Sequence, residues 1–355
     1  MSRFEAGARR EVLLDVAKLS TRYEGRGGSV LAVDAASFRV HPGETVALVG
    51  ESGSGKTTAA LSVLSLLPRG GRVEAGEARF RGRDLVRLDE REMRAVLGAE
   101  IGVVFQDPLA SLDPVHTIGR HVREALRGTP GLSWIARRKR AVELLARVGL
   151  PDPERVARAY PHRLSGGMRQ RAMIAVAIAR RPSLLVADEP TSALDTTVQA
   201  GILELFRSLR AEIGMGILLI THDLAVVAEN ADRAEVMYAG RIVESASVAD
   251  LFAEPRHPYT AMLLRSHPSR ASGARGDRRL ESIPGRVPDP SERPSGCAFR
   301  DRCPLARGRC ADQAPPLLPI AVGARSGSPR SVACHFDEEA PALLAAPVVP
   351  PRSPS

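Results

Sequence analysis

The chain has 355 residues, of which 44% are hydrophobic and 26% charged, and its formal net charge is +9. This hydrophobic content is enough for a buried core and excludes a wholly disordered protein. No stretch approaches the roughly 20 uninterrupted apolar residues of a membrane-spanning helix. The first residues carry an acid early and no apolar core, so they do not resemble a secretory signal. We therefore expect a cytoplasmic protein.

The positive charge comes almost entirely from arginine, because Lys18, Lys56 and Lys139 are the only lysines. A basic chain suggests nucleic-acid binding, but the aromatic residues that stack on bases make up only 4% of the sequence. An anionic membrane surface would use the same charge equally well. We expect no nucleic-acid partner.

The first half of the chain predicts strands around a glycine-rich loop. Short strands with turns are predicted at residues 12–14, 31–33 and 38–40. Residues 46–49 are an apolar run ending at the loop, which is typical of a buried parallel strand. A helix should follow over residues 56–67, because Pro68 and the Gly70-Gly71 pair end it.

Further strands and helices alternate along the chain. Buried strands are predicted at residues 101–105, 184–187 and 217–220, and helices at 196–212 and 224–230. This alternation predicts a doubly wound α/β core that binds its ligand at the carboxyl ends of the strands.

Two segments depart from this pattern and suggest three regions. Apolar residues recur at helical spacing between residues 107 and 182, which indicates a helical insertion. After residue 239 the chain gains Pro, Arg and Ser, with short helices expected at 248–252 and 259–265. We expect a core over residues 1–240, an extension over 241–335 and a disordered tail over 336–355.

Residues 50–57 have the spacing of a phosphate-binding loop, G-x-x-x-x-G-K-[ST]. Glycines let backbone N–H groups turn toward phosphate oxygens. Lys56 would place a full charge on the β- and γ-phosphates, and the Thr57 hydroxyl would bind Mg²⁺. The alternative is a glycine-rich turn without ligand. The predicted nucleotide-binding residues of this segment are Gly50, Glu51, Ser52, Gly53, Ser54, Gly55, Lys56, Thr57 and Thr58.

Asp188 and Glu189 follow a buried strand, where such folds hold their metal. Asp188 would meet Mg²⁺, directly or through water. Glu189 can polarise the attacking water as a general base. A solvated strand end is the alternative interpretation of this pair.

Leu164, Ser165, Gly166 and Gly167 open a predicted helix, with Ser165 as its N-cap. Two glycines allow close backbone approach, so this is a second anion site in a chain with only one Lys-bearing loop. Head-to-tail pairing of two subunits would bring this segment to the partner's nucleotide. An ordinary helix cap is the alternative.

Together with Gln106 and His222, these segments resemble the Q-loop, signature, Walker B and H-loop motifs of ABC ATPases, over roughly residues 11–245. The resemblance implies an α/β P-loop NTPase core with an N-terminal antiparallel β subdomain, a helical insertion subdomain and a small Cys-containing C-terminal extension. It implies that Gln106 senses the γ-phosphate, binds Mg²⁺ and couples to a membrane partner. His222 would contact the γ-phosphate, Asp195 of the D-loop the opposite subunit, and Tyr23 the adenine ring.

The tail resembles that of peptide-importer ATPases, the dipeptide and oligopeptide permease subunits, through His257-Pro258-Tyr259 and Ile283-Pro284-Gly285. Met168 in the signature resembles one of two paralogous ATPase subunits, which favours a heterodimer. The implied partners are this paralogue, two integral membrane permease subunits and, indirectly, an extracytoplasmic substrate-binding protein. The implied location is the cytoplasmic face of the cell membrane.

All four cysteines, Cys297, Cys303, Cys310 and Cys334, fall in one short span with the spacing C-x5-C-x6-C-x23-C. Metal explains such clustering in the cytoplasm better than disulfides do. The lack of a C-x2-C pair counts against a zinc ribbon, and the resembled family carries a 4Fe–4S cluster here. We expect iron–sulfur, with zinc and unligated thiols as alternatives.

The sequence thus predicts an ATP- and Mg²⁺-dependent importer subunit. A soluble ABC ATPase acting on nucleic acid or ribosomes is the rival interpretation. The long coiled-coil or zinc-hook insertions and fused second ATPase unit usual in that class do not occur in this sequence. The cargo stays open among dipeptides, oligopeptides, nickel chelates and glutathione-like molecules.

Overall fold

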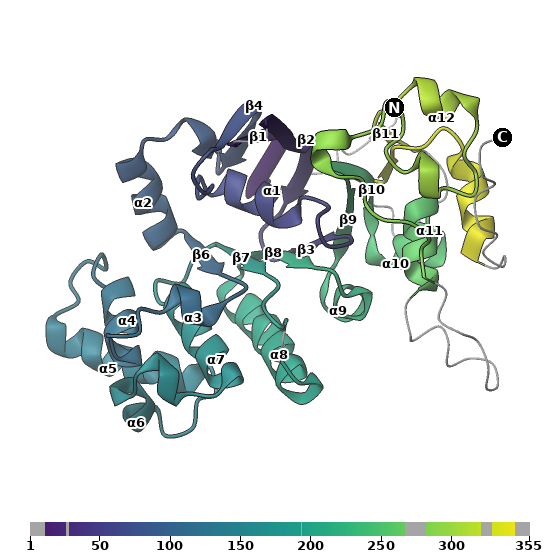
Figure 1. Ribbon diagram of the computed structural model, residues 1–355. Helices are drawn as coiled ribbons and strands as arrows, with labels where there is room; N and C mark the ends of the chain where they lie inside the picture. Colours follow the sequence, from purple (N-terminus) through teal and green to yellow (C-terminus); the bar gives the residue numbers. More distant parts are fainter. Residues whose placement is uncertain (1–10, 26–27, 193, 267–281, 321–328, 345–355) are drawn as a thin grey trace, which may run out of the picture.

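The computed structural model describes residues 11–25, 28–192, 194–266, 282–320 and 329–344. Its centre is a mixed sheet with the strand order β11-β12-β10-β9-β3-β8-β7-β6 (Figure 1). These strands are β3 (Thr45–Val49), β6 (Ile101–Val104), β7 (Leu184–Asp188), β8 (Gly216–Thr221), β9 (Arg233–Tyr238), β10 (Arg241–Ser247), β11 (Leu318–Pro319) and β12 (Ser331–Val332). No helix in these described ranges is both long and apolar enough to cross a membrane.

The five strands from β9 to β6 run parallel and form the predicted α/β core. Every residue of β3, β7 and β8 is buried, which explains their continuous apolar runs. Helix α1 (Lys56–Val63) lies between this sheet and a second sheet, while α8 (Thr196–Ile213) and α9 (Leu224–Asn230) lie on the opposite face (Figure 1). Helix α1 is shorter than predicted, because Ser65 takes a left-handed φ of 52°.

The second sheet is antiparallel, in the order β2-β1-β4-β5. Its strands are β1 (Leu14–Gly25), β2 (Gly28–Val40), β4 (Gly71–Phe80) and β5 (Arg83–Asp84). The first two form one long hairpin where the sequence predicted short strands. Bulges explain the difference, since Lys18 and Ala35 have φ values of 50° and 51° and the pairing register shifts nearby. A bulge interrupts the alternation of side chains and so hides the continuity of the strand.

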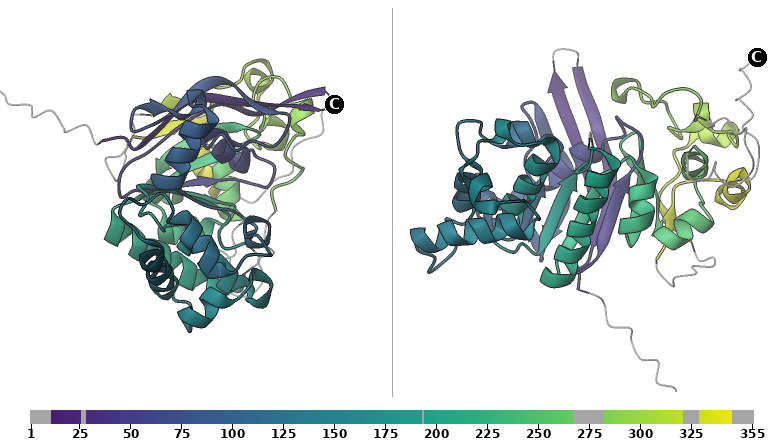
Figure 2. Two further views of the ribbon diagram at one scale, coloured as in Figure 1. Left: turned by 90° about the vertical axis from the view of Figure 1, so that its left-hand side faces the viewer. Right: turned by 90° about the horizontal axis from the view of Figure 1, so that it is seen from below.

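The predicted helical insertion forms its own group of helices beside the core (Figures 1 and 2). Its elements are α3 (Pro108–Ser111), α4 (Ile118–Ala125), α5 (Trp134–Arg147), α6 (Pro153–Arg158), η2 (Pro161–Arg163) and α7 (Gly166–Ala177). The apolar positions at helical spacing, among them Ile118, Val122 and Leu145, are fully buried. The sequence did not predict η1 (Leu85–Arg87) or α2 (Glu90–Ala99), which begins with a capping box between Asp89 and Glu92.

The C-terminal extension continues the central sheet at β10. Its further elements are α10 (Val248–Ala253), α11 (Pro258–Arg265), η4 (Pro290–Glu292), η5 (Arg300–Arg302), α12 (Gly308–Asp312) and η6 (Asp337–Leu344). The buried Glu244 carboxylate of β10 attaches this region to the core. It accepts the backbone N–H groups of Arg256 at 2.8 Å and His257 at 2.9 Å, and it pairs with Arg330 at 2.9 Å.

The structure corrects part of the predicted disordered tail over residues 336–355. Asp337–Leu344 form η6, whose Ala340 is buried and whose Leu343 carbonyl accepts a hydrogen bond from Arg265 of α11 at 2.9 Å. Packing against α11 orders these residues despite their weak local pattern. Residues 345–355 lie outside the described residues.

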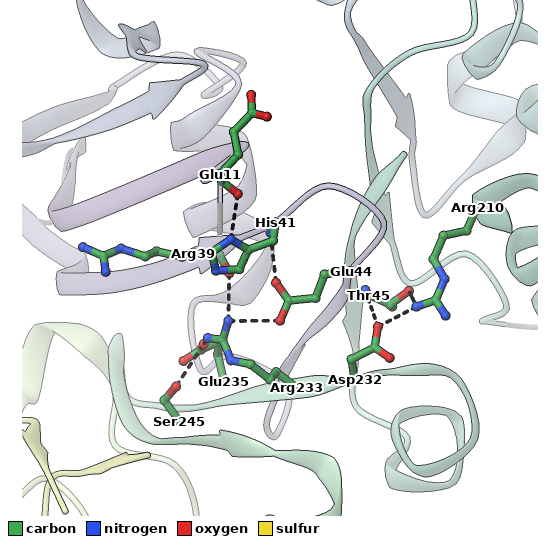
Figure 3. A network of polar contacts seen from close by, with 10 residues as sticks. All are labelled: Glu11, Arg39, His41, Glu44, Thr45, Arg210, Asp232, Arg233, Glu235 and Ser245. Carbon is green, nitrogen blue, oxygen red and sulfur yellow. Dashed lines mark hydrogen bonds and ion pairs between the residues drawn. The ribbon is translucent and has the colours of Figure 1, made fainter. Parts of the chain in front are cut away.

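A network of charged side chains sits where β2 ends, β3 begins and β9 begins (Figure 3). Arg233 pairs with Glu44 at 3.2 Å and also contacts Glu235, whose side chain is 1% exposed. The Ser245 hydroxyl donates to Glu235 at 3.1 Å. Burial raises the pKa of Glu235 to about 7, against the opposing effect of Arg233.

Candidate active site

A cleft of about 580 Å³ lies at the carboxyl ends of the parallel strands. It is lined by residues that follow four different strands: the loop after β3, Gln106 after β6, Glu189 after β7 and His222 after β8. The structure therefore brings together predicted site residues that lie up to 171 positions apart in the sequence, from Glu51 to His222. The full lining is Ala32, Glu51, Ser52, Gly53, Gly55, Lys56, Thr57, Thr58, Gln106, Glu189, His222, Leu263 and Pro290.

Two glycines of the phosphate loop, Gly50 and Gly55, pack so tightly on the core that a side chain has no room there. A Cβ at Gly50 would lie 2.2 Å from the Met237 carbonyl oxygen, and one at Gly55 would lie 2.8 Å from the Ala32 carbonyl oxygen. Gly55 also has a φ of +100°, which L-residues rarely adopt. The hydroxyl of Ser54 is buried and has no hydrogen-bond partner among the described residues. These features fit a loop that offers its backbone to an anion.

Lys56 begins α1 and is 5% exposed. Its Nζ donates to the carbonyl oxygens of Gly50 at 2.8 Å and Glu51 at 2.9 Å. Burial lowers the pKa of Lys56, while the nearby Glu189, Asp188 and Glu51 act in the opposite direction. A buried ammonium at a helix N-terminus is suited to bind phosphate oxygens.

Asp188 and Thr57 could hold a divalent cation. The Thr57 hydroxyl donates to Asp188 Oδ1 at 3.0 Å, so two oxygen ligands already lie together. Burial raises the pKa of Asp188, an effect that the Thr57 hydrogen bond opposes and Glu189 reinforces. A desolvated carboxylate beside a hydroxyl fits Mg²⁺, which prefers hard oxygen ligands.

Glu189 lies between the two other predicted catalytic residues, Gln106 and His222. Gln106 Nε2 donates to its Oε2 at 3.1 Å, and His222 Nδ1 lies 3.1 Å from its Oε1. The backbone of Glu189 takes a left-handed φ of 43°, a conformation that concentrates at functional sites. Its backbone N–H donates to the Ile220 carbonyl at 2.9 Å, which anchors it to β8.

The signature residues lie outside this cleft, on the helical insertion. Ser165 caps α7, with its Oγ accepting the Met168 backbone N–H at 3.3 Å. A Cβ at Gly167 would lie 2.6 Å from Val198 of α8, so this glycine allows the close packing of two helices. Leu164, Ser165, Gly166, Gly167 and Met168 are all absent from the cleft lining.

Two other predicted residues are also placed away from the cleft. Asp195 caps α8 by accepting the Val198 backbone N–H at 2.9 Å. Tyr23 lies in β1, where its ring packs beside Gly71. Neither residue is in the cleft lining.

The cleft lining also includes two residues of the extension that the sequence did not predict. Leu263 comes from α11 and Pro290 from η4, and Ala32 of β2 lines the cleft with them. No motif or spacing connects them to the phosphate loop, because the contact depends on how the extension folds back. They are visible only in the structure.

The structure corrects the predicted iron–sulfur cluster. Cys297, Cys303, Cys310 and Cys334 line one small cavity, and all four are free. Yet no group of three or more His, Cys, Asp or Glu side chains in the described ranges is placed to hold a metal ion, which counts equally against zinc. Burial raises the pKa of Cys303 and of Cys334 to about 12, which favours the neutral thiol when no metal is bound. Unligated thiols are the alternative that agrees with this structure.

Two family models match the chain. The model described as ABC transporter matches residues 33–192, and the one described as oligopeptide/dipeptide transporter, C-terminal region, matches residues 243–310. The chain is 48% identical over 322 residues to a probable peptide ABC transporter ATP-binding protein, y4tR, of Sinorhizobium fredii. This alignment covers 90% of this chain and 96% of that protein. It is 47% identical over 324 residues to the dipeptide transport ATP-binding protein DppD of Escherichia coli, covering 91% and 96%.

Solved structures share the cassette fold. A dimeric post-hydrolysis structure of the ATP-binding cassette MJ0796, bound to ADP and Pi, aligns with a TM-score of 0.60 and 29% identity. The alignment covers 66% of this chain and 98% of that chain. The cbiO1 structure from Clostridium perfringens, part of an ABC transporter complex, aligns with a TM-score of 0.59 and 26% identity over 74% and 97%.

Proposed function

Because this chain belongs to the ABC transporter family, among the ATP-binding proteins of peptide transporters, we propose that it hydrolyses ATP to drive di- or oligopeptide uptake across the cytoplasmic membrane. The observation that carries the ATPase activity is the single cleft into which Lys56, Thr57, Gln106, Glu189 and His222 converge. Each has the chemistry that phosphoryl transfer needs.

The residues of the cleft, together with Asp188, which contacts Thr57, divide the chemistry among them. Lys56 and the loop backbone bind the β- and γ-phosphates. Thr57 and Asp188, with Gln106, would hold Mg²⁺, which neutralises charge on the phosphate oxygens when bound. Glu189 would accept the proton of the attacking water, and its contacts with Gln106 and His222 hold the carboxylate in place for this step.

We further propose that ATP is bound between two subunits. The N-terminus of α7 at Ser165 has the backbone N–H groups of an anion site but stands outside the cleft of its own chain. A partner's cleft would bring nucleotide to it, with Asp195 near the same interface. The signature with Met168 supports a paralogous ATPase as this partner. Tyr23 stays our prediction for the adenine contact.

The helical insertion is our proposed docking surface for the two membrane permease subunits. A groove of about 1050 Å³ there includes Val115, Tyr160 and Met168 in its lining. Val115 is 72% exposed, and Leu109 of α3, three residues after Gln106, is 50% exposed. Apolar side chains left exposed beside a groove are typical of a binding surface. This docking would place the chain at the cytoplasmic face of the membrane. An extracytoplasmic substrate-binding protein would deliver the cargo to the permease subunits at the opposite face.

Reconstitution tests this function. We expect the chain to co-purify with integral membrane subunits, and the complex in proteoliposomes to take up peptide only with ATP. Lys56→Ala should abolish uptake and turnover together. Purification with nucleic acid and without membrane subunits, or uptake that survives Lys56→Ala, would contradict the proposal.

A further inference from the structure

An arginine of the C-terminal extension forms a two-point ion pair with the phosphate loop. Arg302 Nη1 lies 2.9 Å from Glu51 Oε2, and its Nη2 lies 3.1 Å from Glu51 Oε1. The Arg302 side chain is 6% exposed and that of Glu51 is 26% exposed. Parallel, charge-assisted hydrogen bonds of this kind fix geometry as well as charge.

Arg302 is itself held rigidly. Its Nε donates to the Pro284 carbonyl at 2.8 Å, and its guanidinium lies 5.7 Å from the ring centre of Tyr238 and 5.9 Å from that of Phe299. Tyr259 packs against both rings, with centroid distances of 4.7 Å and 5.3 Å. A side chain fixed by packing positions its partner with little loss of entropy.

A second contact from the extension reaches the backbone of the same loop residue. The Glu51 N–H donates to Tyr259 Oη at 2.8 Å, and the Glu51 carbonyl accepts Lys56 Nζ at 2.9 Å. The extension therefore holds Glu51 by side chain and by N–H, while the loop's own lysine holds its carbonyl. The position of Glu51 is therefore fixed jointly by the loop and by the extension.

The charge of Glu51 gives these contacts a second consequence. Glu51 is the only acid in residues 50–58, and it lines the cleft that must accept phosphates. A free carboxylate there would repel ATP. The Arg302 guanidinium neutralises the negative charge of the Glu51 carboxylate through its direct ion pair.

We propose that the extension takes part in ATP binding, with Arg302 and Tyr259 acting as positioning residues for the phosphate loop through Glu51. Leu263 and Pro290 of the same region add to the wall of the cleft. This inference rests on the proposed use of the cleft for ATP. It assigns the extension a task in the ATPase cycle that is separate from peptide recognition.

The test compares Arg302→Ala with Arg300→Ala in the full chain and in the assembled complex. Arg300 lies two residues before Arg302, and its Nη1 donates to Ser295 Oγ and to the Ala311 carbonyl oxygen, each at 3.2 Å. Both partners belong to the extension, so Arg300 serves as the control. We expect Arg302→Ala to raise KM and Kd for ATP about tenfold, as loss of a charge-assisted hydrogen bond predicts, with kcat near wild type. Such a split marks lost ground-state binding. Arg300→Ala should leave both values unchanged.

Rescue variants separate positioning from simple destabilisation. Arg302→Lys keeps one charge but not the two-point geometry, so it should restore part of the affinity. In a Glu51→Gln background, Arg302→Ala should add little, because its target carboxylate is gone. Thermal unfolding is measured for every variant. If Arg302→Ala does not fold, Tyr259→Phe, which loses one hydroxyl, should still weaken ATP binding several-fold.

Two outcomes would overturn the inference while leaving the proposed function intact: a folded Arg302→Ala that binds ATP as wild type does, or equal losses in Arg302→Ala and Arg300→Ala. For an Arg302 variant that does not fold, unchanged ATP binding by Tyr259→Phe would do the same. Failure of the wild-type chain to bind ATP would instead contradict the proposed function itself.

Discussion

Gln106 Nε2 donates a hydrogen bond to Glu189 Oε2 at 3.1 Å. These residues follow neighbouring parallel strands, β6 and β7, so the sheet itself sets their separation. Gln106 also precedes α3, the first helix of the insertion that we propose binds the permease. Movement of that insertion would therefore act directly on the carboxylate that activates water.

Replacing Glu189 by Gln should abolish ATP turnover and leave ATP binding intact. The amide keeps the shape of the side chain but cannot accept the proton of the attacking water, a role usually worth about 10²–10⁴ in rate. Turnover is measured in the assembled complex, and binding by titration with ATP. Glu204→Gln is the control, because Glu204 is an exposed residue of α8 paired with Arg207. Hydrolysis retained by Glu189→Gln would remove this residue from its role.

Asp188→Asn should raise the Mg²⁺ concentration needed for half-maximal turnover by at least about tenfold, since perturbing even the outer contacts of a metal ligand costs this much. The amide is a weaker ligand than the carboxylate that Thr57 contacts at 3.0 Å. The measurement is turnover against MgCl₂ concentration. Asp113→Asn, at a half-exposed carboxylate of the insertion, should behave as wild type. Equal Mg²⁺ dependence in both variants would contradict the metal site.

Ser165→Ala should reduce turnover of the assembled complex beyond what loss of a helix cap explains. The matched control is Ser133→Ala, because Ser133 caps α5 with the same geometry, accepting the Ala136 N–H at 3.2 Å. Each substitution costs about 1 kcal/mol of stability. Only Ser165 is proposed to reach a partner's ATP. If both variants lose the same activity, Ser165 is an ordinary cap.

Glu235 should make the stability of the protein pH-dependent near neutrality. Its pKa is raised by burial from 4.5 to about 7, so the folded chain keeps a proton that the unfolded chain has lost in this window. The free energy of unfolding should therefore fall as pH rises from 4.5 to about 7, by at most about 3.4 kcal/mol, and then level off. Glu235→Gln should flatten this part of the curve in denaturant titrations. Parallel curves for wild type and variant would show that Glu235 keeps an ordinary pKa.

The sequence was most informative where structure is local. The run of residues 46–49 and the loop after it were predicted correctly because a buried strand and a phosphate loop each need a continuous pattern. The long hairpin was missed because bulges at Lys18 and Ala35 break the alternation of side chains. The ends of the parallel strands then brought Gln106, Glu189 and His222 together as the α/β pattern implied.

Contacts between distant segments could not be predicted. Tyr259 and Arg302 lie 208 and 251 positions from Glu51, and no periodicity connects them. The cysteine spacing had the opposite weakness: it placed four thiols close in sequence and suggested a metal, but it carried no information on their geometry. Burial of Cys303 and Cys334, which keeps them protonated, depends on the folded extension.

The attachment of the extension through β10 has a consequence for any shortened form of this protein. A chain truncated after β10 would leave one edge of that strand unpaired, and its free backbone N–H and C=O groups could pair with another copy of the chain. The Glu244 carboxylate, which is 0% exposed, would also lose its ion pair with Arg330 and its hydrogen bonds from the backbone amides of Arg256 and His257. The isolated cassette is thus expected to aggregate. A soluble truncated variant would need Glu244 replaced by an apolar residue and charged residues placed along the exposed edge of β10.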